Sequence, residues 1–455
     1  MPVNVRSWVA AVAAAGALSG CLGAEPPASK QDFNPTSGQI ATTGQAATTD
    51  QAATTGQTAT TGQTGRPDSA GATSALIADL QARNSLLSPG GPFDRVAASV
   101  IEASAGASVA ELRVAQLKSA AKSKNWLPQI GPSVNLTSLS GLVTDLLLQQ
   151  ALFDNGARKA ERAYAAADVE VAAVTLAVEM NQRVYAGLAY YVRAEQARAQ
   201  AAVASSGAER MARFDAIITE RMEGGLSDRS EQQVIRQHLV EMQATLAGDR
   251  EAETSAMAEL AALAAEPLDQ VRGLDTLAPD DAGVAPLSVL RARSEGTQLV
   301  AEASLERAQL LPGVRATASV GLTGIEPGLR LGGGLLNSGM KETIAALDAT
   351  TEVAARQVTQ AAEDAQRRIV MLERQIATLQ QREASSAVVL SQTRENLDLF
   401  TEQYEVGRRT LLELVNQYRD FTRLEREQAG LRHEMALLRL EIARDRGQLV
   451  DGAQM

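Results

Sequence analysis

The sequence predicts a mainly α-helical chain with a small β part, and three observations support this fold class. Aromatic residues make up only 3% of the 455 residues, while alanine is frequent, which suits helices packed closely through small side chains. No proline occurs at 133–266 or after residue 327. Because proline in a helix interior costs about 3 kcal/mol, these stretches permit long helices. The third observation is a block of sequence that is present twice.

The duplicated block is defined by three anchors that follow the same order in both copies. The matched positions are the Leu-Phe-Asp-Asn-Gly of 152–156 with the Leu-Leu-Asn-Ser-Gly of 335–339, the Leu-Pro of 127–128 with that of 311–312, and Gly225 with Gly407. Their offsets are 183, 184 and 182 residues. A unit of this size exceeds the common solenoid repeats, so we expect two copies of one module packed around a pseudo-symmetry axis.

The N-terminus predicts an export signal and a lipid anchor. Residues 8–18 form an apolar run after Arg6, too short to span a membrane and typical of a signal peptide, so residues 1–20 are assigned to one. The Leu-Ser-Gly-Cys that ends it resembles a bacterial lipobox, in which Cys21 would be acylated, with palmitate among the acyl chains. Leu22 rather than Asp follows the lipobox, which favours the outer membrane. Cys21 is the only cysteine, so no intramolecular disulfide is expected.

The segment after the lipobox predicts a flexible tether. Residues 41–64 are four hexads built mainly from alanine, threonine, glycine and glutamine. Such low-complexity sequence buries too little apolar surface to offset the entropy of ordering. We therefore expect residues 21–74 to connect a lipid anchor to a folded body.

Each copy of the module begins with a helix and continues into two strands. The helices are expected at 93–124 and 287–310. A turn is expected at Glu326-Pro327, between the two strands of the second copy. The apolar positions that alternate with small or polar ones are Ile130, Val134, Leu136, Leu146, Leu148 and Leu152 in the first copy, and Val314, Ala316, Ala318, Val320, Leu322, Leu329, Leu331 and Leu335 in the second. This period of two predicts strands with one apolar face.

Strands of this kind fit either a transmembrane barrel or a soluble hairpin with one buried face. A barrel strand needs about 9–11 residues, which both copies supply. Four strands cannot close a barrel, and open sheet edges are not tolerated in lipid. If the strands span a membrane, several protomers must therefore contribute to one barrel.

A very long helix and a shorter return helix complete each copy. The long helices are expected at 156–223 and 339–405, about 100 Å each at about 1.5 Å per residue. The return helices run to about residues 265 and 447. Sustained heptads with charged flanks are absent, so a plain dimeric coiled coil is not favoured.

Tight turns reverse the chain between the long and the return helices. Gly225 and Gly407 lie where a left-handed glycine cap would end each long helix. Two capping boxes would begin the return helices, Asp228 with Glu231 and Thr410 with Glu413.

We therefore divide the chain into seven segments. These are a lipoprotein signal peptide (1–20), a low-complexity flexible tether (21–74), a lead-in (75–92), the first structural repeat (93–266), an inter-repeat linker (267–286), the second structural repeat (287–447) and a C-terminal tail (448–455).

The lipobox, the duplicated units, the Leu-Phe-Asp-Asn-Gly junction and the Gly-Leu-Ser of 225–227 together resemble the TolC family of outer-membrane factors, over residues 93–447. The resemblance implies a homotrimer whose four strands per protomer form a transmembrane barrel of twelve strands above a periplasmic tunnel of long helical hairpins. It implies an exit duct for small molecules or proteins, as in efflux and type I secretion, with no cofactor. Its partners would be outer-membrane lipid, a periplasmic adaptor and an energising inner-membrane pump or ABC transporter. The chain would be lipid-anchored in a Gram-negative outer membrane and extend into the periplasm.

The resemblance also assigns roles to the turns. Family members meet adaptors at these loops, which here hold Gly225, Leu226, Ser227, Gly407, Arg408 and Arg409. At the periplasmic gate, Glu413 matches one of two acidic positions and Asn416 occupies the other, which implies one acidic ring. Glu413 as a gate residue and Glu413 as a helix cap are both left open. Interfacial aromatics are few, with only Trp126 and Phe153 beside the first hairpin.

Two other function classes fit less of the sequence. A periplasmic adaptor lipoprotein usually has one helical hairpin between β-domains, and a structural coiled-coil lipoprotein needs no strands. No catalytic motif is present, and the net charge of −11 argues against nucleic-acid binding. His238 and His433 lack partners at metal-ligand spacing and are expected to be solvated helix-surface residues. The sequence therefore predicts no enzyme and no metal site.

Overall fold

The computed structural model describes residues 74–104, 106–138, 141–278, 283–321, 324–332 and 339–454, with backbone only at 133–145. The structural statements below concern these residues. The signal peptide, Cys21, nearly all of the tether, Leu322 and Leu335 lie outside them, as do the side chains of Val134 and Leu136. The described residues all belong to one compact unit of the chain.

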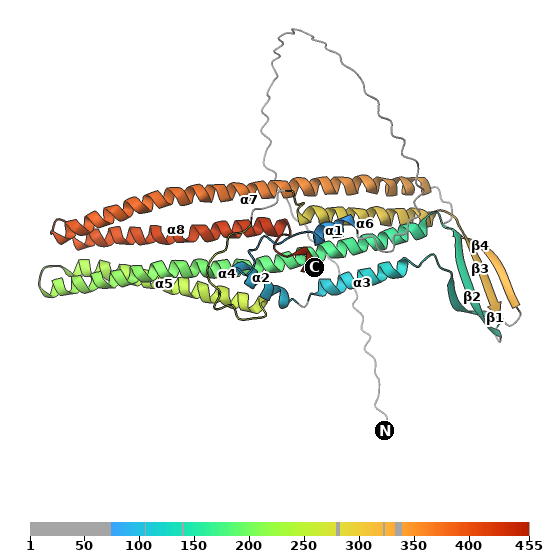
Figure 1. The fold of residues 1–455 in the computed structure, drawn as a ribbon, viewed down its shortest axis with the longest axis horizontal. Coiled ribbons are helices and arrows are strands. Elements are labelled where there is room, and N and C mark those ends of the chain that lie inside the picture. The colour runs from blue at the N-terminus through green and yellow to red at the C-terminus, as the bar shows by residue number, and fades with distance from the viewer. Residues whose placement is uncertain are drawn as a thin grey trace, which may run out of the picture. The chain divides into compact units, whose positions relative to one another are not determined.

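The described fold is mainly helical, with one small sheet, as the sequence predicts. Figure 1 shows the elements in chain order. They are α1 (Ala75–Gln81), α2 (Pro92–Glu102), α3 (Ala107–Lys122), β1 (Gln129–Ser138), β2 (Gly141–Phe153), α4 (Ala157–Glu223), α5 (Arg229–Leu263), α6 (Leu287–Leu310), β3 (Gly313–Gly321), β4 (Gly324–Gly332), α7 (Met340–Glu405), α8 (Leu411–Asp445) and a 3₁₀ turn, η1 (Gly452–Gln454).

The long helices and their return helices repeat with nearly equal lengths. Helices α4 and α7 have 67 and 66 residues, and α5 and α8 have 35 each. Gly156 and Gly339 lie just outside the long helices as their N-caps. The return helices end two residues earlier than expected, at Leu263 and Asp445. The long-helix hairpins predicted from the proline-free stretches are confirmed.

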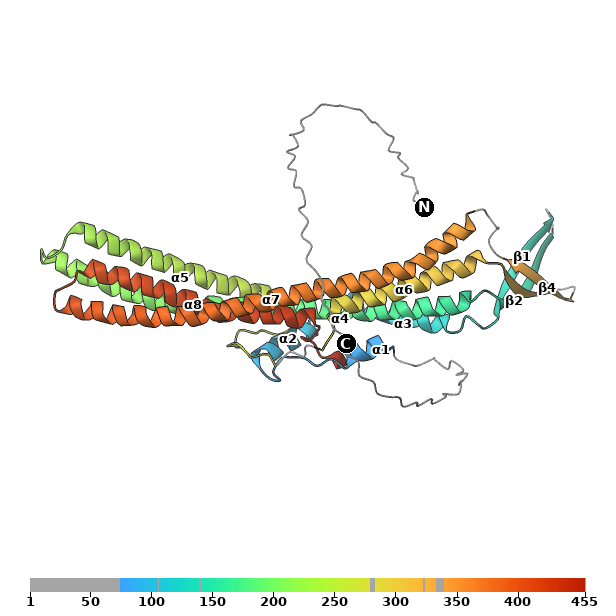
Figure 2. The same ribbon diagram turned by 90° about the horizontal axis from the view of Figure 1, so that it is seen from above.

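Helix α4 is the element against which most of the others pack. It contacts α2, α3, α5, α6 and α8, whereas α7 contacts α6 and α8 (Figure 2). Its buried residues are mostly alanine and glycine. At Gly187 a Cβ would lie 2.7 Å from Val100 of α2, and at Gly207 one would lie 2.7 Å from Thr422 of α8. Small side chains therefore set how closely the neighbouring helices approach α4.

The four strands form one antiparallel sheet in the order β1-β2-β3-β4. The central pair, β2 with β3, joins the two copies of the module. The turn predicted at Glu326-Pro327 is wrong, because both residues lie inside β4, opposite Ser319 and Ala318. Gly321 opposite Gly324 is the last described pair of these two strands. Proline is tolerated in an edge strand, and β4 is an edge of this sheet.

The Leu-Phe-Asp-Asn-Gly block forms the junction between β2 and α4. Asp154 accepts hydrogen bonds from the backbone N–H groups of Gly156 and Arg158, both at 3.1 Å, and so caps the first turn of α4. Asn155 and Gly156 have positive φ angles of 50° and 86°. The Asn155 amide donates to the carbonyl of Pro312 at 2.8 Å. The sequence anchors of the two copies therefore touch at this junction.

The single helix expected at 93–124 is instead two helices, α2 and α3, separated around Gly106. The break lets the two segments pack differently. Helix α2 buries Phe93 edge-to-face on Tyr191 of α4, with ring centroids 6.1 Å apart. Leu268 of the linker and Leu449 of the C-terminal tail join the same core. The linker and the tail are thus packed parts of the helical body.

We expect Gly207→Ala and Gly248→Ala to change stability in opposite directions. A Cβ at Gly248 meets nothing within 4 Å, so alanine should raise the thermal midpoint through its helix preference of about 1 kcal/mol. At Gly207 the clash with Thr422 should lower the midpoint, because overpacking costs about 1–3 kcal/mol. Circular dichroism melts of both variants in detergent measure this. A higher midpoint for Gly207→Ala would contradict the packing described for α4.

Candidate functional site

The two turns predicted from the sequence, here called the tip loops (224–228 and 406–410), have the same backbone geometry. Gly225 and Gly407 adopt φ angles of 69° and 75°. In the first loop, Leu226 donates its N–H to the carbonyl of Arg221 at 2.9 Å. In the second, Arg408 donates to the carbonyl of Gln403 at 2.8 Å. These six-to-one bonds are Schellman closures, and the predicted left-handed glycine caps are confirmed.

Each tip loop presents one large apolar side chain to solvent. Leu226 is 80% exposed and Val406 is 69% exposed. Arg408 is also exposed. The sequence analysis predicted Leu226 as a contact residue but not Val406, although Val406 directly precedes the predicted cap residue Gly407.

Arg409 lies inside a network of side chains within the second tip. Its guanidinium stacks over the ring of Phe400, with 4.5 Å between Cζ and the ring centroid. It donates to Oε1 of Gln403 and to Oε1 of Glu413, both at 3.0 Å. Arg409 therefore braces the tip loop against α7 and α8.

Glu413 completes a capping box at the start of α8. Its backbone N–H donates to Oγ1 of Thr410 at 3.3 Å, and its Oε2 accepts the backbone N–H of Thr410 at 2.9 Å. The hydrogen bond from the Thr410 backbone, followed by that from Arg409, holds the pKa of Glu413 below its ordinary value. The predicted capping box is confirmed for this pair. Asn416 lies one turn further along α8 and is half-buried.

The box predicted at the first tip is only half formed. Asp228 accepts from the backbone N–H groups of Ser230 and Glu231, at 2.8 and 3.0 Å. Glu231, however, accepts from the hydroxyl of Ser227. The Glu231 carboxylate thus bonds the Ser227 side chain, and no reciprocal bond from the backbone of Asp228 is present in this described loop. Ser227 thus has a structural role within its loop.

An aromatic cluster that the sequence analysis missed joins the two hairpins near their tips. Arg221 of α4 lies over the ring of Tyr404 of α7, at 5.2 Å. Phe214 and Tyr418 meet edge-to-face with centroids 6.0 Å apart. Four of the chain's twelve phenylalanine and tyrosine residues fall within 400–421, and this clustering was the signal available in the sequence.

At the other end of the long helices, one face of the sheet is apolar and uncovered. Its register places Ile130 opposite Leu148, and Leu148 opposite Ala318. The exposed apolar side chains of this face are Ile130, Leu146, Leu148, Val320, Ile325, Leu329 and Leu331, between 37% and 84% exposed. Trp126 and Phe153 near the start of β1 and the end of β2 are 60% and 58% exposed. The predicted parity of the two hairpins is confirmed at the predicted positions among them, which are Ile130, Leu146, Leu148, Val320, Leu329 and Leu331.

The expectation that both histidines are solvated is wrong. His238 and His433 are each only 8% exposed. Burial lowers the pKa of His433, whose Nδ1–H donates to the carbonyl of Ala429 at 2.9 Å. Packing between helices distant in sequence covers both rings, which a local helix pattern cannot reveal. No group of three or more metal-ligating residues is found in the described part of the chain.

Within the described ranges, no helix combines the length and apolar content needed to cross a membrane.

Comparisons with solved structures identify the fold. The outer membrane protein VceC from Vibrio cholerae superposes with a TM-score of 0.64 at 16% identity, covering 82% of this chain and 95% of that one. The CmeC outer membrane channel from Campylobacter jejuni gives 0.64 at 10% identity, covering 82% and 85%. The MtrE outer membrane channel from Neisseria gonorrhoeae, in its open state, gives 0.58 at 15% identity, covering 84% and 90%. The chain has the TolC-family fold.

Neither a family model nor a curated relative matches the sequence. Within the TolC-family fold, the residues singled out above lie at opposite ends of α4 and α7. The tip loops and Glu413 are at one end, and the amphipathic sheet is at the other (Figure 1).

Glu413 gives a pH test that separates its two roles. A lowered pKa means that its stabilisation of α8 is complete above the unfolded-state pKa, about 4.3, and is lost as pH falls through the folded value. Three carboxylates close together in a gate would instead raise the pKa. We expect amide-exchange protection of the first turn of α8, corrected for intrinsic rates, to hold down to about pH 4.3 and then fall.

Glu413→Gln is the matched control, because it keeps the capping geometry and removes the titration. Protection in this variant should not change over the same pH range. Loss of protection well above pH 4.3 in the wild type would instead indicate a crowded acidic ring.

Proposed function

We propose that this protein is a homotrimeric outer-membrane exit duct for small molecules or proteins. A periplasmic adaptor docks on it, and an inner-membrane pump or ABC transporter supplies the energy. The uncovered apolar face of the sheet carries this proposal. Leu329 and Leu331 are 72% and 84% exposed, an arrangement that is unfavourable in water and suited to lipid.

The sheet needs neighbours to complete it. Its edges β1 and β4 have free ladder groups, and an open edge is not tolerated in lipid. Placing β4 of one protomer beside β1 of the next would close a barrel of twelve strands from three protomers. Such head-to-tail contacts form a ring when the rotation closes.

The helices offer matching surfaces for the same ring. Only four of the 66 residues of α7 are buried in one protomer. Its exposed large apolar residues are Val353, Met371, Val388, Val389 and Leu399. On the opposite side of α4, α3 exposes Val109, Val114 and Leu117. We infer that α7 of one protomer packs on α3 and α5 of its neighbour.

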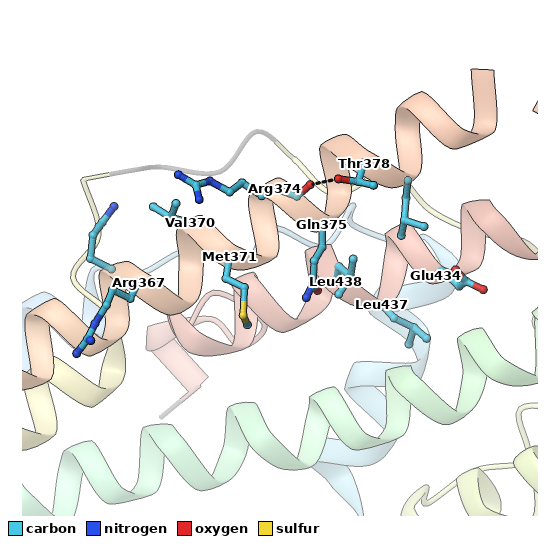
Figure 3. Close-up of a pocket in the computed structure, with 11 residues that line it drawn as sticks. Arg367, Val370, Met371, Arg374, Gln375, Thr378, Glu434, Leu437 and Leu438 are labelled. Carbon is cyan, nitrogen blue, oxygen red and sulfur yellow. Dashed lines mark hydrogen bonds between the residues drawn. The ribbon is translucent and has the colours of Figure 1, made fainter. Parts of the chain in front are cut away.

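A groove between α7 and α8 supports this interface. It encloses about 900 Å³ and is lined by apolar side chains that include Val370, Met371 and Leu437 (Figure 3). Arg367, Arg374 and Glu434 lie along it. An apolar floor with charged side chains around it is the arrangement of a protein interface.

The trimer is tested by native mass spectrometry in detergent together with single-channel recordings in planar bilayers. We expect a mass of three chains and discrete conductance steps. Leu329→Arg, on the apolar face, should reduce stable insertion, because a lipid-facing arginine costs about 2–4 kcal/mol at the bilayer midplane. Ser319→Arg places the same charge on the polar face and should insert normally. A monomer without conductance would exclude the duct.

The adaptor is proposed to bind the two tip loops. Leu226, Val406 and Arg408 are exposed side chains of these loops, and Arg409, Ser227 and the two glycines shape the loops. We place the periplasmic gate beside them, at Glu413 and Asn416. The resemblance to the TolC family supports this placement.

Gly225→Pro and Gly407→Pro should abolish export while leaving trimer assembly intact. Proline cannot adopt the positive φ of either position, and the tips lie about 100 Å from the sheet by helix length. Gly224→Ala is the control, since Gly224 has a φ of −78° that alanine adopts freely. Export assays in cells, with trimer yield measured in parallel, decide the matter. Undiminished export in both proline variants would exclude the tips from the docking site.

The lipid anchor is proposed at Cys21, after removal of residues 1–20. Acylation adds about 0.8 kcal/mol of membrane affinity per buried CH₂, and two or more chains anchor stably. We expect Cys21→Ala to block lipobox processing and reduce the protein in the outer-membrane fraction. Radiolabelled palmitate incorporation and membrane fractionation measure both effects. Normal processing in the presence of globomycin would contradict the lipobox.

A further inference from the structure

Two arginines lie side by side on the polar face of the sheet. Arg315 of β3 and Arg330 of β4 are direct cross-strand partners, and both are exposed. Like charges directly opposite one another destabilise a strand pair. Sheet stability therefore does not explain why both positions carry the same charge.

These arginines differ from the paired arginines of the helices. Arg426 forms two hydrogen bonds with Asp249, and Arg368 pairs with Glu441 at 2.6 Å. Among the described residues, neither Arg315 nor Arg330 has an ion pair or a side-chain hydrogen bond. The next charge on β4, Glu326, is four residues away, about 13 Å at about 3.3 Å per residue. Among the side chains that the structure describes, no carboxylate of the sheet therefore pairs with either arginine.

Small residues surround the pair and leave space above it. Ala151 lies opposite Arg315 on β2, and Gly328 and Gly332 flank Arg330. A Cβ at Gly328 would meet Oγ1 of Thr317 at 2.9 Å, so packing accounts for that glycine. A Cβ at Gly332 would meet nothing within 4 Å. A strand glycine weakens the strand and can mark a site that another molecule approaches closely.

We propose that Arg315 and Arg330 bind a soluble multivalent oxyanion, such as a solute with phosphate, carboxylate or sulfonate groups. A guanidinium offers a planar fork of donors that matches these groups in a bidentate manner. Two forks from adjacent strands point to the same side of the sheet, because their Cα atoms are paired in register. One anion can therefore engage both.

The position of the pair gives this site a role in the proposed duct. Its face is opposite the exposed apolar face, so lipid on one side places the arginines on the inner wall. The pair lies near the ends of β3 and β4 that join the helices. On the basis of the proposed function, a trimer would carry six arginines at that level. Rings of arginine favour anions in pores, so the inference assigns anionic solutes to the cargo.

The test is calorimetric titration of inorganic pyrophosphate into the full chain in a neutral detergent. We expect saturable binding, weakened about tenfold or more in R315Q/R330Q and less in R315K/R330K, which keeps the charge but not the fork. Glu326→Gln, on the same face, and Arg356→Gln, an exposed arginine of α7, should bind as the wild type does. Absent binding, or equal binding in R315Q/R330Q, would overturn the site.

The site and the duct can fail separately, because each arginine pair belongs to one protomer. In neutral phosphatidylcholine bilayers, pyrophosphate should block wild-type current and not that of R315Q/R330Q. Binding without any conductance would retain the site and exclude the duct. Conductance without block would retain the duct and exclude the anion from its inner wall. If micelles containing phosphatidylglycerol abolish pyrophosphate binding, the ligand is a lipid headgroup and the soluble-solute proposal fails.

Discussion

The close approach of helices to α4 is the constraint on which the rest of the fold depends. Gly187, Gly207 and a series of alanines allow α2, α5, α6 and α8 to pack on a single helix. The same device recurs where Gly430 of α8 faces Gln200 of α4, and where Gly296 of α6 meets Ala354 of α7. Because large side chains cannot enter these contacts, stability comes from many small dispersion contacts along the helices. The low aromatic content of the chain follows from this packing.

Polar contacts then fix the register of one helix against the next. Asp249 is 6% exposed and accepts both hydrogen bonds from Arg426, which joins α5 to α8. Arg198 pairs with Glu253 across α4 and α5. Breaking a buried pair of this kind leaves an uncompensated charge. Sliding one helix past another would break several pairs at once and is therefore unfavourable. Alanine-rich surfaces alone have little preference for one register over another, so these ion pairs select the register.

Much of the fold could be predicted because its signals are local. The proline-free stretches contain the long helices, and the helix at Leu287–Leu310 has the predicted ends. Thr410 and Glu413 form their box because both residues belong to one turn. What failed depends on distant segments. The burial of His433 arises from packing against helices distant in sequence, and the place of Pro327 in an edge strand is set by its pairing with β3. The pairing of Arg315 with Arg330 likewise could not be predicted, because it depends on the register between β3 and β4.

The near-equal lengths of the repeated helices give the two hairpins the same reach. Helices α4 and α7 differ by one residue, and α5 and α8 do not differ at all. Since each helical residue adds about 1.5 Å, seven residues inserted into each helix of one hairpin would carry its tip about 10 Å beyond the other. A change of reach must therefore be made in both halves of the gene together. The repeated sequence anchors indicate an origin of the two hairpins by duplication, and a shared reach requires that their lengths stay matched.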